Sequence, residues 1–153
     1  KSRMFYHSGA YRQAVESYAE IQKEMRENAR FMFEYGHALH KLHEPELSNK
    51  VLKEALKVSG DPMILNIIGK NEQEMKHYES AEYWFMRAVH RLPGRIYPYY
   101  LLANLYADPS FYRRDKLERM VQTVLEKEPK IQSTAIKQMR RKARELLKKV
   151  PEN

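Results

Sequence analysis

Three histidines have a spacing that could support chemistry. His37, His40 and His43 follow one another at steps of three residues, and two histidines three positions apart on a helix can share a metal ion. Glu44 is the one acidic side chain that obviously converges on them, and the chain has no cysteine. The alternative interpretation is that these histidines are groove or surface residues. We assign no metal and no cofactor to the chain.

Tyrosine is the second suggestive residue type, with 11 tyrosines among 153 residues. Five of them crowd one segment beside three arginines: Tyr97, Tyr99, Tyr100, Tyr106 and Tyr112, with Arg95, Arg113 and Arg114. Aromatic rings interleaved with arginine can stack on bases or sugars. Helical spacing explains Tyr99 and Tyr106 better as core residues, and Tyr97 and Tyr100 better as groove residues.

Catalytic motifs are missing from the sequence. It contains no Gly-x-Ser-x-Gly elbow, P-loop, dinucleotide-binding fingerprint or His-Glu-x-x-His motif. The carboxylate pairs, such as Glu72 with Glu74, fall at expected turns and helix surfaces, where charge is usually solvated. We therefore predict a chain that is not an enzyme by itself and takes no small-molecule substrate.

Length and composition indicate a helix-rich protein built as one domain or as a few repeated units. Five glycines and no cysteine disfavour turn-rich β folds, disulfide frameworks and cysteine-bound zinc. No apolar run reaches the roughly 18 residues that a membrane span needs. The first residue is Lys1 and not Met, so we expect the chain to be a fragment of a longer protein.

Three columns of residues repeat with a period of about 34. The first column holds small residues: Gly36, Gly69 and Ala103. The second holds residues of the expected second helix of each hairpin: Ala14, Ser48, Ala81 and Leu117. The third holds helix terminators: Gly60, Pro93 and Pro129. Small residues let two helix backbones approach closely. We predict helices over 1–8, 11–26, 29–42, 45–58, 62–75, 78–91, 96–107, 113–127 and 133–149. The expected fold class is an all-α solenoid of helical hairpins.

The clearest unit carries Leu65, Ile68 and Gly69, followed by Ala81, Phe85, Ala88 and Pro93. It resembles the tetratricopeptide repeat, and departs from that pattern at Glu72, where the family has an aromatic residue. The resemblance implies a single domain over 1–153 with about three full repeats. These are a partial repeat at 1–28, repeats at 29–61 and 62–95, a repeat with a long turn at 96–130, and a basic capping helix at 131–153.

In this family, peptides bind a concave groove lined by the first helix of each hairpin. By register, the resemblance places twelve residues there: Arg30, Phe33, His37, His40, Lys41, Met63, Asn66, Lys70, Gln73, Tyr97, Tyr100 and Asn104. This implies a protein or peptide partner whose identity is open. The alternative is a solvated groove, or one filled by the rest of a longer chain. The carboxylate-clamp version of the family is not matched, because Phe33, His37 and Tyr97 occupy its polar columns.

The formal net charge of +8 is concentrated at one end of the chain. Residues 130–153 hold eight basic and two acidic residues, and we expect six of the basic ones to form an exposed surface: Lys137, Arg140, Arg141, Lys142, Arg144 and Lys148. Apolar residues at steps of three and four share one face of the same helix. We predict a capping helix; contact with an anionic membrane surface is the alternative, and nucleic acid is disfavoured.

A narrower resemblance covers the last third of the chain. Segments 95–102 and 124–130, followed by 133–135, resemble the C-terminal repeat regions of bacterial O-antigen ligase or polymerase-like membrane proteins. It implies a soluble tail attached to the inner membrane through upstream sequence, on a side that stays open. Two alternatives are a free-standing scaffold unrelated to glycans and the repeat part of a soluble glycosyltransferase.

Overall fold

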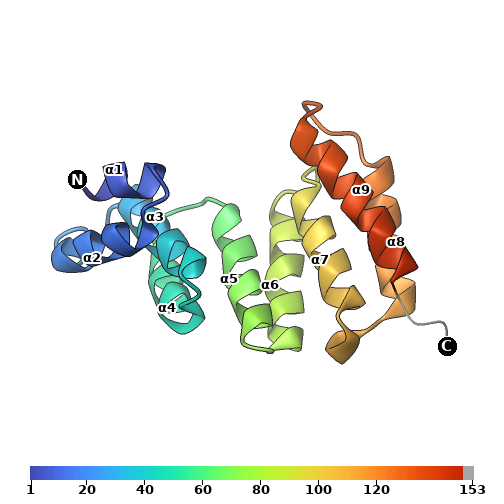
Figure 1. Ribbon diagram of the computed structural model, residues 1–153, viewed down its shortest axis with the longest axis horizontal. Coiled ribbons are helices and arrows are strands. Elements are labelled where there is room, and N and C mark those ends of the chain that lie inside the picture. Colours follow the sequence, from blue (N-terminus) through green and yellow to red (C-terminus); the bar gives the residue numbers. More distant parts are fainter. Residues whose placement is uncertain (150–153) are drawn as a thin grey trace. The chain divides into compact units, whose positions relative to one another are not determined.

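The computed structural model describes residues 1–149 (Figure 1). Within that range every regular element is helical, which confirms the predicted all-α class. The helices are α1 (Ser2–His7), α2 (Tyr11–Ile21), α3 (Ala29–Lys41), α4 (Pro45–Ala55), α5 (Met63–Glu74), α6 (Tyr78–Arg91), α7 (Tyr97–Ala107), a 3-10 turn at Pro109–Phe111, α8 (Arg114–Glu126) and α9 (Thr134–Lys148). The end of the predicted capping segment, 150–153, lies outside the described residues.

Each predicted helix corresponds to an observed one, but α2 and α4 end earlier than predicted. After Ile21 the chain continues as turns, with the Met25 N–H donating to the carbonyls of Ile21 and Gln22, both at 3.2 Å. After Ala55 the bonds likewise tighten to a three-residue span, as when the Val58 N–H donates to Ala55 O at 3.1 Å. Periodicity cannot separate such turns from helix, because they carry apolar residues at nearly the same spacing.

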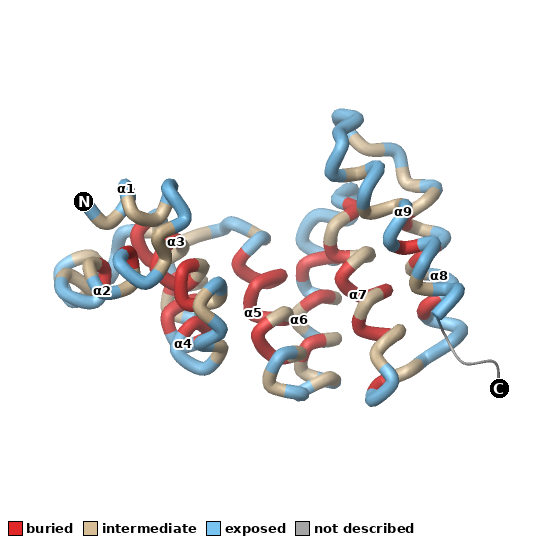
Figure 2. Tube along the Cα trace, viewed as in Figure 1, coloured by how far each residue is buried: buried red, intermediate tan, exposed pale blue. Residues whose placement is uncertain are grey.

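The chain divides into two compact units, Lys1–His77 and Tyr78–Asn153. In the first, α1 packs on α2, α2 on α3, α3 on α4, and α5 on both α3 and α4. In the second, α6 packs on α7, α7 on α8, and α9 on both α7 and α8. Figure 2 shows the buried residues concentrated on α3, α5 and α7 and few of them on α9. The single-domain repeat boundaries stay a prediction.

The small-residue column marks a close helix contact in the first unit. A Cβ added at Gly36 on α3 would lie 2.5 Å from Leu52 Cγ on α4. The Ser48 hydroxyl of α4 donates to Gly36 O at 2.7 Å, which requires the same close approach. A side chain at Gly36 would push against Leu52, so a small residue is needed where the first sequence column predicted it.

Three hairpin turns share one backbone conformation that the sequence analysis did not identify. Gly9, His43 and Lys76 follow α1, α3 and α5 with φ of 82°, 58° and 66°. In each turn the next residue donates its N–H to a carbonyl five positions back: Ala10 to Phe5 at 2.8 Å, Glu44 to Leu39 at 3.0 Å and His77 to Glu72 at 2.8 Å. This is the Schellman helix ending, in which the left-handed residue satisfies carbonyls that the helix leaves open. The turn between α7 and α8 uses the 3-10 turn instead.

Two helix starts are capped by side chains. The Ser133 hydroxyl accepts a hydrogen bond from the Ile136 N–H at 3.2 Å, and Asp61 Oδ1 accepts one from the Met63 N–H at 2.9 Å. Side-chain acceptors of this kind satisfy N–H groups that have no partner within the helix. Over residues 1–149, no helix combines the length and apolar character that crossing a membrane would require.

Candidate functional site

Three side chains of α3 form a continuous row of stacked rings, which we call the aromatic–histidine row: Phe33, His37 and His40. The ring centroids of Phe33 and His37 are 6.0 Å apart with 27° between the planes. Those of His37 and His40 are 6.2 Å apart with 18° between the planes. All three residues are half-buried. The structure thus brings together three of the twelve predicted groove residues as one ordered surface.

Tyr6 of α1 fixes His37 within the row. Its hydroxyl lies 2.6 Å from His37 Nδ1, and its ring meets the imidazole edge-on at 5.7 Å. Burial lowers the pKa of His37 to about 4, helped by the charges of Lys41, His40 and Lys70. Burial also raises the pKa of Tyr6 to about 12. Because the neutral imidazole and the protonated phenol are favoured, we infer that the hydroxyl donates to Nδ1 and that the ring proton sits on Nε2.

His40 is held by a buried polar network that joins α3, α4 and α5. Its Nδ1 lies 2.7 Å from Asn71 Oδ1, an acceptor, so Nδ1 carries the proton and Nε2 accepts. Asn71 Nδ2 donates in turn to Ser48 Oγ and to Asn49 Oδ1, both at 2.8 Å. Burial lowers the pKa of His40, while the Asn71 hydrogen bond opposes that shift. The rotamer and tautomer of His40 are therefore set from inside the unit.

The two bonds that hold the row are one contact repeated along the chain. Tyr6 and His40 are 34 residues apart, and so are their partners His37 and Asn71. Each bond joins the first helix of one hairpin to the first helix of the next. Sequence reasoning missed this repeat, although the recurrence of hydrogen-bonding side chains at both positions could have shown it.

A buried carboxylate adjoins the row in the first unit and was not predicted. Glu34 is 4% exposed; it receives the Tyr18 hydroxyl at 3.0 Å and lies 3.1 Å from Arg3 Nε. Burial raises the pKa of Tyr18, and the bond to Glu34 adds to that effect. The cluster ties α1, α2 and α3 together, and a buried charge with both partners in place is a structural feature rather than a reactive one.

The other predicted groove residues of the first unit differ in accessibility. Arg30, Lys41 and Met63 are exposed, and Lys70 and Gln73 are half-buried. Asn66 is 5% exposed, with its amide nitrogen 3.8 Å from Met63 Sδ. Charged and apolar side chains are thus accessible on α3 and α5, and the Asn66 amide is turned into the packing.

Tyr97, Tyr100 and Asn104 lie on α7 in the second unit. The two tyrosine rings stack at 6.5 Å with 29° between their planes, and both residues are half-buried. The Asn104 amide donates to Tyr100 O at 3.2 Å, within its own helix. The pair supplies ring surface on α7, while the Asn104 amide is occupied by the backbone.

The predicted basic surface of α9 is exposed at five of its six positions: Lys137, Arg141, Lys142, Arg144 and Lys148. Arg140 differs, because its guanidinium donates to Val124 O at 3.0 Å and to Lys127 O at 2.7 Å. It satisfies carbonyls at the end of α8. On the opposite side, Ala143 is buried and Ile136 and Leu146 pack against the core of the second unit. The apolar side of α9 is therefore largely occupied by the protein itself.

Each of the three histidines first singled out has its own partner. Tyr6 contacts His37, Asn71 contacts His40, and Glu74 lies 2.6 Å from His43. Within residues 1–149, no group of three His, Cys, Asp or Glu side chains could hold a metal ion.

Comparison with known proteins shows the fold. No family model matches the chain, and no curated protein matches it. A solved structure titled "Crystal structure of MamA" has a TM-score of 0.74 and 17% identity, covering 96% of this chain and 90% of that one. A second, titled "Crystal structure of MamA protein", has a TM-score of 0.64 and 17% identity, covering 96% and 84%. The chain is thus similar to MamA, a helical solenoid of tetratricopeptide type, which confirms the predicted fold class.

Proposed function

We propose that the chain is a non-catalytic interaction module that binds an extended peptide of a protein partner across α3. The observation that carries this is the aromatic–histidine row, which is ordered from inside and half-buried on a helix surface. Rigid rings offer a large contact area at a low cost in conformational entropy. The MamA-like fold supports the proposal, because helical solenoids bind partners along surfaces built from successive repeats.

The spacing of the row suits a peptide backbone. Its rings are 6.0 and 6.2 Å apart, and side chains on one face of an extended strand recur every ~6.6–6.8 Å. By the tautomers inferred above, His37 Nε2 is a donor and His40 Nε2 an acceptor. One donor beside one acceptor matches the alternating carbonyl and amide groups of a strand.

Charge around the row favours an acidic peptide. Arg30 and Lys41 are exposed on the same helix, while the nearby carboxylate of Glu34 is buried and paired. The pKa of His37 is lowered mainly by burial and partly by Lys41 and Lys70, which lie close enough to the row to act on it.

A displayed library of random 12-residue peptides tests this function. We expect enrichment on the wild-type chain and its loss on a Phe33→Ser/His37→Ser variant whose helix content is unchanged by circular dichroism. Tyr83→Ser is the matched control, since Tyr83 is an aromatic residue of α6 that is 58% exposed. Enrichment that persists on the Phe33→Ser/His37→Ser variant would place the binding surface elsewhere.

A second, finer proposal places the chain as the soluble tail of an O-antigen ligase or polymerase-like protein at the bacterial inner membrane. It is supported by the sequence resemblance of segments 95–102 and 124–130. Sequencing the reading frame upstream of Lys1 tests it. Several apolar runs of about 18 residues or more would support the membrane tail. More helical repeats would favour a free-standing scaffold, and an α/β nucleotide-sugar domain would favour a soluble glycosyltransferase.

A further inference from the structure

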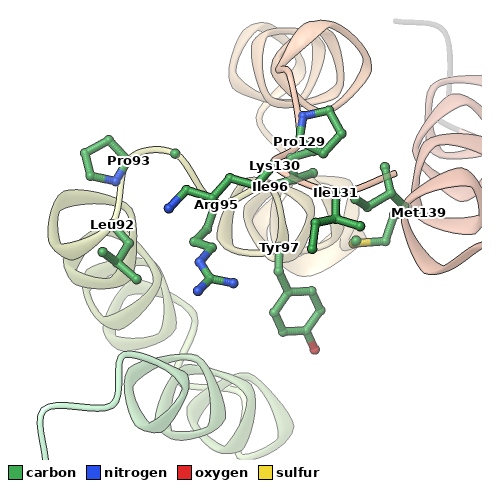
Figure 3. A pocket seen from close by; sticks show the side chains of 11 residues that line it. Leu92, Pro93, Arg95, Ile96, Tyr97, Pro129, Lys130, Ile131 and Met139 are labelled. Atoms are coloured by element: carbon green, nitrogen blue, oxygen red, sulfur yellow. The ribbon is translucent and has the colours of Figure 1, made fainter. Parts of the chain in front are cut away.

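A pocket of about 580 Å³ lies in the second unit, away from the aromatic–histidine row (Figure 3). Its walls are the turn between α6 and α7, the turn between α8 and α9, and the first part of α9. Ligand pockets typically measure about 300–1,000 Å³. Figure 3 shows Leu92 and Pro93 on one side and Ile131 and Met139 on the other, with Arg95 and Lys130 between them.

Hydrogen bonds hold one wall of the pocket and the start of the other. On one wall, the Arg95 N–H donates to Leu92 O at 3.1 Å, and the Tyr99 hydroxyl donates to Pro93 O at 3.4 Å. On the other, the Arg140 guanidinium anchors the start of the α8–α9 turn through Lys127 O at 2.7 Å. A wall held in this way needs little reorganisation to accept a ligand.

The lining combines apolar side chains with positive charge. Ile96 is buried at its base, while Leu92 and Ile131 are 37% and 78% exposed. Arg95 and Lys130 are both exposed, and the lining contains no acidic residue. A ligand that complements this lining carries negative charge and aliphatic side chains.

We propose that this pocket binds a short peptide segment in which acidic and aliphatic residues alternate. The aliphatic side chains enter between Leu92 and Ile131, and the carboxylates pair with Arg95 and Lys130. This site is separate from the proposed function of α3 and does not depend on it. A lipid surface fits less well, because Ile136, Ala143 and Leu146 of α9 already pack in the protein.

The test is a ¹⁵N-correlated NMR titration of the full chain with three octapeptides. The first alternates glutamate with leucine and isoleucine, the second replaces the glutamates by lysine, and the third replaces the aliphatic residues by serine. We expect saturable shifts for the first peptide at the residues that line the pocket. Binding of the second and third should be at least about tenfold weaker, since each lacks one part of the match.

Two pairs of variants locate the site. Ile131→Ser and Arg95→Glu should each weaken binding of the first peptide at least about tenfold. The matched controls Leu147→Ser and Arg141→Glu change exposed residues of α9 outside the pocket and should leave it unchanged. Phe33→Ser should also leave it unchanged, so failure of the α3 proposal would be seen separately.

Three results would overturn the proposal. The first is an absence of saturable shifts at the lining residues. The second is equal binding of the lysine peptide, and the third is equal binding of the wild type and Ile131→Ser. A separate sedimentation experiment uses vesicles of phosphatidylglycerol and phosphatidylcholine. Sedimentation with them that depends on Ile131, without peptide binding, would show a membrane contact and reject the peptide.

Discussion

Replacing Gly36 by alanine tests the helix contact on which the first unit is built. The new Cβ would lie 2.5 Å from Leu52 Cγ, and Leu52 is fully buried. Carbon atoms in contact normally sit about 3.5–4.0 Å apart, so the Leu52 side chain must be displaced by about 1 Å or more, and because it is fully buried the displacement pushes α4 away from α3. That movement also stretches the 2.7 Å hydrogen bond from the Ser48 hydroxyl to Gly36 O.

The expected cost follows from three opposing effects. Overpacking a core costs about 1–3 kcal/mol, and weakening one buried hydrogen bond adds about 0.5–1.5 kcal/mol. Alanine returns about 1 kcal/mol through its better helix propensity. We therefore expect Gly36→Ala to lower the free energy of unfolding by about 1–3 kcal/mol.

Urea denaturation followed by circular dichroism measures this change. The matched control is Gly94→Ala, where an added Cβ meets nothing within 4 Å and φ lies outside the left-handed region. It should be neutral or stabilising by up to about 1 kcal/mol. A Gly36→Ala/Leu52→Ala double variant should be more stable than the sum of the two single changes by at least about 1 kcal/mol. Equal stabilities of Gly36→Ala and Gly94→Ala would refute the close contact.

Three further changes have defined outcomes. Lys76→Gly should raise the unfolding free energy by about 0.5–1 kcal/mol in urea denaturation, because glycine adopts the φ of 66° without strain; a decrease would contradict the turn assignment. Tyr18→Phe should lower it by about 1–3 kcal/mol, since the buried Glu34 loses a donor, and an unchanged value would show that Glu34 does not need this bond. Burial lowers the pKa of His37 from 6.5 to about 4, so between these pH values the unfolded chain binds a proton at His37 that the folded chain does not. The free energy of unfolding should therefore fall as the pH is lowered from 6.5 to 4. His37→Gln should flatten that part of a stability–pH profile, and an unaltered slope would contradict the shift.

The sequence predicted the helix order and the contacts made by small residues. Gly36 is repeated by Gly69, and Ser48 by Ala81, at one period because a close backbone approach permits few residue types, and such constraints leave a pattern in a single sequence. The left-handed turns escaped notice because glycine occupies that position in one turn, at Gly9, while His43 and Lys76 tolerate it in the others.

The site could be predicted only in part. The register implied by the tetratricopeptide resemblance placed Phe33, His37 and His40 on one face, and the structure shows them stacked. The bonds to Tyr6 and Asn71 depend on how neighbouring helices rotate about their axes and on the rotamers chosen, which periodicity does not specify. The hydrogen bonds from the Arg140 guanidinium to the end of α8 likewise depend on where that helix ends.

The most direct test of the central claim is the affinity of a library-selected peptide, measured by isothermal titration calorimetry on wild type and on Phe33→Ser. Phe33 begins the stacked row, and its half-buried ring contributes area to the proposed surface. We predict saturable one-to-one binding to the wild type, and at least about tenfold weaker binding to Phe33→Ser at unchanged thermal stability. Equal affinity for both proteins would contradict an interaction module that works through α3.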